Sequence, residues 1–307
     1  MFRFIISLSI FLLSTNSMAA YASTLKLETV TENVYAIIGE LGNRTPDNLG
    51  NNSNFGFVVT NEGVVLIDSG ATYGGAKEIE TVVSSVTNQP IVKVINTGGQ
   101  DHRWLGNNYF KNKGVEVIAS SDAVTDQKAR LNAQLSRLEA LLGDKLLNQT
   151  TPEYADVVFD DNYSFQLGGI NFQIYHAGQA HTPGDSFIWL PQQSVMFAGD
   201  IVYVDRMLGV MDHSNSKSWI NVFELMMNFN PEYIVPGHGS VTNLEKAKKD
   251  TYEYLKQLRL KVSDFMDKGG DAADIKLVDM TDYQYLQNFE TLSGRNAQRV
   301  YTELEWE

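Results

Sequence analysis

The sequence of 307 residues contains no cysteine, which excludes disulfide bonds and thiolate metal ligands. It is also poor in positive charge, with 24 Lys and Arg residues against 37 Asp and Glu residues and a formal net charge of −13. Because the basic residues do not gather in one stripe, nothing in the chain favours binding to nucleic acid. An acidic protein of this kind is also repelled by anionic lipid surfaces.

Low-complexity tracts, internal repeats and linkers rich in Pro or Ser are absent as well. Hydrophobic residues make up 43% of the chain, so a sizeable core can be buried without disulfide bonds. We therefore expect one globular domain over residues 23–240. The helices that we expect over residues 241–307 should pack on the same domain.

The N-terminus carries a hydrophobic run of its own. Arg3 precedes an apolar segment at residues 4–13, and Ala20 and Ala22 form an Ala-x-Ala site after it. These features are typical of a secretory signal peptide, and the run is short for a membrane span; an uncleaved anchor or a buried helix is the alternative. We expect residues 1–22 to be a signal peptide and the mature protein to be periplasmic or secreted, without membrane contact after cleavage.

Hydrophobic periodicity predicts strands and helices in an alternating order. Strands are expected at residues 34–38, 55–60, 64–67, 91–95, 115–119, 163–165, 170–175, 186–190, 195–198 and 233–235. Helices are expected at residues 73–86, 104–110, 122–148 and 216–229, and over most of the C-terminal remainder. This alternation indicates a layered α/β fold, in which functional groups gather at strand ends. The long helix should pack one apolar face on the domain; a role as a wall or lid over the site is the alternative.

Potential metal ligands lie at the ends of several predicted strands. Three of the five histidines, His102, His181 and His238, fall in glycine-rich turns, and Asp200 falls in a fourth such turn. His181 and Asp200 flank one predicted hairpin, whose paired strands lie about 5 Å apart and can bring its ends together. Imidazole and carboxylate ligands together suit Zn, Fe or Mn. The pattern predicts a metal site on one rim of a sheet; alternatively, His181 caps a turn and Asp200 begins a loop.

Several segments also give the chain a resemblance to a known family. They are residues 65–70 (VLIDSG), 95–97 (INT) with 105–107 (LGN), 180–185 (AHTPGD), 197–200 (FAGD) and 235–239 (VPGHG). Through them, residues 25–305 resemble the metallo-β-lactamase-fold hydrolases, and the branch they resemble most is that of the exported SoxH-like enzymes near quinoprotein relay systems. The resemblance implies an αββα sandwich with a helical C-terminal extension and a metal site at one edge.

By position, the resemblance implies roles for four residues. His181 matches a ligand of the first metal, Asp200 matches the carboxylate that bridges two metals, and His238 matches a ligand of the second metal. Asp68 matches a carboxylate that braces the ligand loop, as metal sites generally need.

The first metal-binding motif of the family, Thr-His-x-His-x-Asp-His, is altered in this chain. Aligned without gaps, Thr97 is kept, while Gly98 and Gln100 stand at the places of the two leading histidines. Glycine offers no ligand, and glutamine offers only a carbonyl oxygen. In this register His102 stands at the place of the Asp, and Arg103 at that of the last His.

A shift of one residue makes Asp101 and His102 the Asp-His pair instead, and the sequence leaves both registers open. We expect one metal ion rather than two, since a catalytic zinc typically needs three protein ligands and an open position. This divalent ion, with zinc favoured and iron as the alternative, should be held by His102, His181, Asp200, His238 and, as a weaker candidate, Gln100.

These residues predict a metal-dependent hydrolase of a small-molecule substrate. The metal would acidify a bound water and polarise a carbonyl, while Asp200, or Asp101 in the shifted register, would orient that water and accept its proton. Arg103 would hold a substrate carboxylate or position the metal loop. His213 and Met207 are candidate substrate contacts, with a surface-loop histidine and a plain apolar rim as the alternatives.

Two other functions are open. A binding protein with a degraded site is favoured by Gly98 and Gln100 and disfavoured by the retention of His181, Asp200 and His238. A mononuclear iron redox enzyme on the same fold is also compatible with the altered ligand set. Among substrates, a β-lactam, a lactone, a thioester and a sulfur compound all fit.

Overall fold

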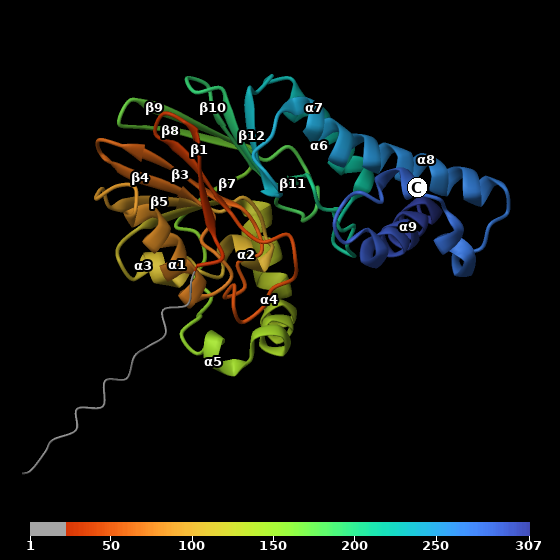
Figure 1. Cartoon of the computed structure of the whole chain (residues 1–307), viewed down its shortest axis with the longest axis horizontal. Coiled ribbons are helices and arrows are strands. Elements are labelled where there is room, and N and C mark those ends of the chain that lie inside the picture. Colours follow the sequence, from red (N-terminus) through yellow and green to blue (C-terminus); the bar gives the residue numbers. More distant parts are fainter. Residues whose placement is uncertain (1–22) are drawn as a thin grey trace, which may run out of the picture.

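The computed structural model describes residues 23–307, so the predicted signal peptide, residues 1–22, lies outside the described residues. Within that described part of the chain, no helix is long and apolar enough to cross a membrane. Two β-sheets pack face to face, and helices cover both outer faces (Figure 1). This is the αββα sandwich that the sequence predicts.

The first sheet has seven strands in the order β1-β2-β3-β4-β5-β6-β7. Strands β1 to β4 pair antiparallel, and β4 to β7 pair parallel. The strands are β1 (Lys26–Thr31), β2 (Val34–Ile38), β3 (Phe55–Thr60), β4 (Gly63–Ile67), β5 (Ile91–Ile95), β6 (Glu116–Ser120) and β7 (Val157–Phe159). The sequence predicts neither edge strand, because β1 is largely exposed and β7 is only three residues long.

The second sheet has five strands in the order β12-β11-β10-β9-β8. They are β8 (Asn162–Leu167), β9 (Ile170–Tyr175), β10 (Phe187–Leu190), β11 (Val195–Tyr203) and β12 (Tyr233–His238). The predicted hairpin of β10 and β11 is present. However, β11 continues through a bulge at Gly199 (φ +50°) to Tyr203, so Asp200 lies inside a strand rather than in the predicted turn.

Alternate residues of the central strands build the two sides of the first sheet. Val65 and Ile67 face the second sheet, whereas Val64 and Leu66 face the outer helices. This period of two is what a strand with both faces buried requires. The outer face is covered by α1 (Tyr73–Ser84) and α3 (Asn107–Lys111), which share a buried cluster with it.

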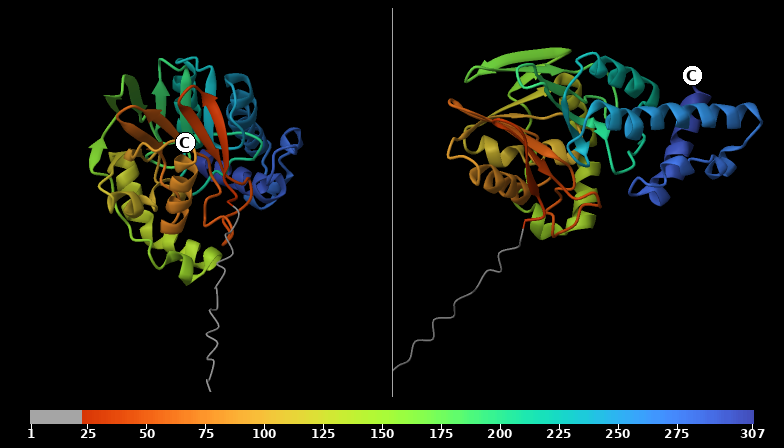
Figure 2. Two further views of the ribbon diagram at one scale, coloured as in Figure 1. Left: turned by 60° about the vertical axis from the view of Figure 1, so that its left-hand side comes forward. Right: turned by 45° about the horizontal axis from the view of Figure 1, so that its top comes forward.

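The C-terminal helices pack beside the second sheet and extend beyond the edge of the sandwich (Figure 2). One buried cluster joins Ala198 of β11 to Trp219, Leu258 and Val300 on three helices. These elements are α6 (Ser216–Met227), α7 (Leu244–Ala247), a π-helical turn (Lys248–Tyr252), α8 (Glu253–Asp267), two 3₁₀ turns (Ala272–Leu277 and Thr281–Tyr283) and α9 (Phe289–Glu305).

The long helix predicted at 122–148 is shorter than expected. It forms α4 (Ser121–Leu142) and stops at Gly143, whose φ of +77° is a left-handed conformation that favours glycine, before the short α5 (Asp144–Leu147). Leu138 and Leu142 pack on Trp104 of α2 (Asp101–Trp104). The helix is therefore both packed on the domain and, through other residues, part of a pocket wall.

Candidate functional site

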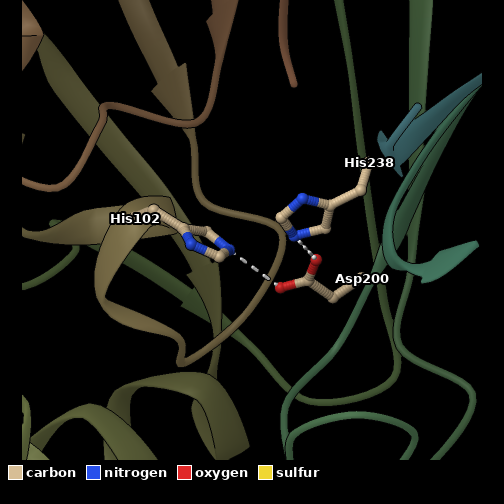
Figure 3. A group of neighbouring side chains, drawn as sticks. All are labelled: His102, Asp200 and His238. Atoms are coloured by element: carbon tan, nitrogen blue, oxygen red, sulfur yellow. Dashed lines mark hydrogen bonds and ion pairs between the residues drawn. The ribbon is translucent and has the colours of Figure 1, made fainter. Parts of the chain in front are cut away.

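The side chains of His102, Asp200 and His238 converge on one another (Figure 3). They come from α2, β11 and the end of β12, and each is at most 3% exposed. One potential ligand atom of each lies within 4.8 Å of the other two. The Asp200 carboxylate lies between the imidazoles, with Oδ2 3.1 Å from His102 Nε2 and Oδ1 3.4 Å from His238 Nε2. We call these three residues the donor group.

Arg103 fixes the Asp200 carboxylate from the side of the protein interior. Its guanidinium donates to both carboxylate oxygens, at 2.6 and 3.2 Å, and to Asp68 Oδ2 at 2.9 Å. It also donates to the carbonyls of Asn54 and Gly237. Burial raises the pKa of Asp200, but the opposing effect of Arg103 is decisive and holds it well below its usual range. Asp200 is therefore ionised.

This arrangement corrects one of the two roles expected of Arg103. The side chain is 1% exposed and does not line the pocket, so it cannot hold a substrate carboxylate. It positions the loop instead. Asp68 completes the brace by accepting hydrogen bonds from Thr97 N at 2.7 Å and Thr97 Oγ1 at 2.9 Å.

Asp101 lies on the far side of His102 from Asp200. It forms a buried ion pair with Arg44 and accepts a hydrogen bond from the His102 backbone at 2.8 Å. It neither joins the donor group nor lines the pocket, so the structure gives it no contact with a reacting water. His102, which both registers retain, is the residue of this turn that the fold brings to Asp200 and His238.

His181 is brought near the donor group but not into it. Its Nδ1 lies 3.0 Å from the carbonyl of Gly209, which can only accept a hydrogen bond, so Nδ1 carries the proton and Nε2 keeps its lone pair. Burial lowers the pKa of His181, which favours the neutral ring. His181 lines the same pocket as His102 and His238.

The two histidines of the donor group are held in the opposite tautomer. Arg44 Nη2 lies 2.7 Å from His102 Nδ1, and Arg206 Nη1 lies 3.0 Å from His238 Nδ1. Because a guanidinium can only donate, both Nδ1 atoms accept and both Nε2 atoms carry the proton that faces Asp200. Burial lowers the pKa of both rings, for His238 to about 3, so both are neutral.

The space beside Gly98 and Gly99 is filled by acidic side chains. A Cβ on Gly98 would overlap Asp185 Oδ1, and one on Gly99 would overlap Asp126 Oδ2. Gln100, the weaker ligand candidate, accepts a hydrogen bond from Arg130 at 3.3 Å. Gly98 and Gln100 therefore offer no ligand for a first metal, which leaves His181 as the residue that matches one.

We expect Gly98→His to lower the free energy of unfolding by about 1–3 kcal/mol through overpacking, without adding a metal site. Urea unfolding and elemental analysis measure the two effects. Gly294→Ala is the control, since a Cβ at this helical position meets nothing within 4 Å and should leave stability unchanged or slightly raised. One additional bound metal in Gly98→His would contradict the prediction.

The neighbouring Asp185 makes a contribution to the free energy of unfolding that decreases as the pH rises. Burial, and then the charge of Asp200, raises the pKa of Asp185 to about 8. An Asp carboxyl in the unfolded chain titrates near pH 3.9, so between these values the native state holds a proton that the unfolded state has lost. The contribution of Asp185 to stability therefore falls as pH rises from about 4 to about 8.

Asp185→Asn should flatten this slope, because the amide cannot ionise. Relative to the wild type, the variant should gain stability between about pH 5 and about pH 8 in urea unfolding. The exposed Asp144→Asn is the control and should follow the wild type. Equal slopes in all three proteins would show that Asp185 is not protonated in the native state.

The donor group opens into a pocket of about 360 Å³. The two predicted substrate contacts do not line it. Met207 is fully buried in the cluster with the C-terminal helices, and His213 is partly buried beside Arg130, where burial lowers its pKa to about 3. The lining residues are Asn43, Arg44, Asn52, Gln100, His102, Arg137, Ala140, Leu141, His181, Tyr203, Arg206, Gly209, Met211, His238, Asn288, Thr291, Leu292 and Arg295.

Comparison with known sequences identifies relatives of the central region. A family model described as the metallo-β-lactamase superfamily matches residues 49–238. The metallo-β-lactamase type 2 of Elizabethkingia meningoseptica is 26% identical over 186 residues, which cover 59% of this chain and 67% of that protein. The enzyme of the same name from Bacillus cereus is also 26% identical, and the match covers 59% of this chain and 65% of that protein. The chain thus spans about two thirds of these relatives.

Solved structures share the fold. A metallo-β-lactamase from Pontibacter korlensis has a TM-score of 0.61 and 23% identity, and covers 76% of this chain and 99% of its own. The sec-alkylsulfatase Pisa1 from Pseudomonas sp. has a TM-score of 0.68 and 18% identity, and covers 91% of this chain and 50% of its own. At these identities the likeness concerns the fold alone.

Proposed function

Because the chain belongs to the metallo-β-lactamase superfamily, we propose that it is a metal-dependent hydrolase of a small-molecule substrate, with one divalent ion at His102, Asp200 and His238. The convergence of these three side chains at the pocket carries the proposal. Two imidazoles and a carboxylate form a ligand set that catalytic zinc sites use, with a position left for water. Zinc is the favoured ion, and iron is the alternative.

The surroundings of the donor group fit one ion and set a condition for it. Arg103 keeps Asp200 ionised, as a metal ligand must be. For each imidazole to bind through Nε2, its proton must move to Nδ1, so Arg44 and Arg206 must turn to another acceptor. Metal-bound histidines usually donate their other N–H to an acceptor.

The ion, when bound, supplies an acidified water and a Lewis acid. His181 would be the pocket residue placed to hold a proton released there, because Gly209 fixes its ring with Nε2 unprotonated. Asp200 is a weak base, since Arg103 lowers its pKa. This moves the predicted proton-accepting role from Asp200 and Asp101 to His181.

A second candidate is a binding protein of the same fold that works without a metal. It is favoured by the hydrogen bonds from Arg44 and Arg206, which occupy both Nδ1 atoms with donors. In that case the donor group is a neutral network around one ion pair, Asp200 with Arg103.

Chelation and reconstitution distinguish the two candidates. The mature protein should hydrolyse at least one of a β-lactam, a lactone, a thioester and a sulfate ester, lose this activity after chelation, and regain it with Zn²⁺ or Fe²⁺. His238→Ala should be inactive, and His176→Ala, a histidine outside the pocket, should remain active. Hydrolysis that survives complete metal removal would overturn the proposal, and absence of both metal and hydrolysis would favour the second candidate.

The cellular setting is part of the proposal. The pattern of residues 1–22 supports export by a signal peptide. The segment at residues 296–305 (NAQRVYTELE) resembles the corresponding end of the SoxH-like enzymes and so supports that branch of the superfamily. Cell fractionation should recover the mature protein outside the cytoplasm, starting near residue 23. Recovery of the full-length chain from the cytoplasm would contradict this.

A further inference from the structure

We propose that the pocket above the donor group is an oxyanion site, so that the substrate carries a sulfate, phosphate or carboxylate group. The inference rests on the proposed function in one respect: it names the substrate class of the same site. The binding of an anion does not itself need the metal.

Four arginines from separate parts of the chain line this pocket. Arg44 comes from the loop between β2 and β3, Arg137 from α4, Arg206 from the segment after β11, and Arg295 from α9. No Asp or Glu among residues 23–307 lines it. In a chain with 37 acidic and 24 basic residues, this is a local reversal of the overall charge.

These cations have few partners in the described part of the protein. Arg137, Arg206 and Arg295 form no ion pair with a carboxylate there, and only Arg44 has one, with Asp101. Partial desolvation at the pocket wall, and then the charge of Arg44, lowers the pKa of Arg137. Four like charges around one pocket repel one another unless an anion lies between them.

Two buried donors also lack an acceptor. The Nε atoms of Arg44 and Arg206 are buried and have no hydrogen-bond partner in the described chain. Arg44 is 8% exposed and lines the pocket, so its unpartnered donor belongs to a side chain that the fold holds in place. An unsatisfied buried donor costs about 1–3 kcal/mol, and charge-assisted hydrogen bonds to an oxyanion would remove that cost.

The same anion would accept the hydrogen bonds that Arg44 and Arg206 must withdraw from the two histidines before a metal ion binds. When Arg44 and Arg206 donate to an oxyanion, they release Nδ1 of His102 and His238, which can then carry the ring protons. The reacting bond of a substrate anchored in this way lies next to the donor group.

Calorimetric titration with inorganic sulfate, inorganic phosphate and acetate tests the inference at constant ionic strength. The protein is titrated as purified and again after chelation. Arg137 and Arg295 are exposed and unpaired within the described residues, so Arg137→Gln with Arg295→Gln should fold and weaken anion binding by about tenfold or more. Lys145→Gln removes one exposed charge outside the pocket and should change the affinity by less than about twofold.

The order of affinities identifies the charged group of the substrate. Tightest binding of acetate indicates a carboxylate, and tightest binding of sulfate or phosphate indicates a tetrahedral ester. Absence of binding for all three anions, or equal losses in Lys145→Gln and the arginine variants, would overturn the inference. Anion binding that persists in a protein without metal-dependent hydrolysis would support the inference while the proposed function fails.

Discussion

Arg103→Met is expected to lower the free energy of unfolding by about 3–5 kcal/mol, since removing one partner of a buried ion pair leaves an uncompensated charge. The guanidinium is 1% exposed and bridges Asp68 and Asp200. Without it, both carboxylates lose their cation, and the carbonyls of Asn54 and Gly237 lose their donors. Urea unfolding followed by tryptophan fluorescence measures the loss.

Two further variants separate charge from geometry. Arg103→Lys keeps a positive charge but not the planar fork that reaches both carboxylates. Its free energy of unfolding should therefore lie between those of the wild type and Arg103→Met. Lys217→Met removes an exposed pair with Glu307 and should cost no more than about 1 kcal/mol. Equal losses in Arg103→Met and Lys217→Met would contradict the structural role of Arg103.

Asp200→Asn is expected to weaken metal binding by more than about 100-fold, beyond the 10–100-fold typical of groups that only support a ligand. The amide keeps the shape of the side chain but loses the charge that offsets both the ion and Arg103. Hydrolysis should disappear with the metal. Competition with a chromogenic chelator measures the affinity.

The matched control is another buried Asp→Asn change on the same side of the fold. Asp185 is 1% exposed but lies outside the donor group, so Asp185→Asn should keep the metal affinity within about threefold of the wild type. Full metal affinity in Asp200→Asn, with the fold intact, would remove Asp200 from the ligand set.

The sequence predicts most strands of a layered α/β fold because buried strands have a strong local signature, and the resemblance to the metallo-β-lactamase-fold hydrolases implies the sandwich. The runs in β3, β4 and β5 are rich in β-branched and aromatic residues, which favour strands. At the end of β11 the sequence predicts a turn instead of a strand, because Gly199 and Asp200 are residue types typical of turns. Pairing with β12, a segment about 40 residues away, carries the strand through them, and no local pattern shows this.

The sequence likewise predicts some residues of the candidate site and not others. Motifs at strand ends pointed to His102, Asp200 and His238, which the fold brings together. His181 shares those motifs, yet the structure keeps it out of the donor group, because the Gly209 carbonyl fixes its ring. That contact joins residues far apart in sequence.

The arginines had no motif at all. Arg44 lies in the long polar loop before β3, and Arg206 stands next to the buried Met207 that the sequence singled out. What the four arginines share is that their side chains line one pocket, and only the folded chain shows this.

Elemental analysis of the purified mature protein tests the central claim most directly. We predict about one divalent ion per chain, lost in His102→Ala and His238→Ala and kept in His181→Ala, because His181 lies outside the donor group. No metal above background in the wild type, or two ions per chain, would contradict the account.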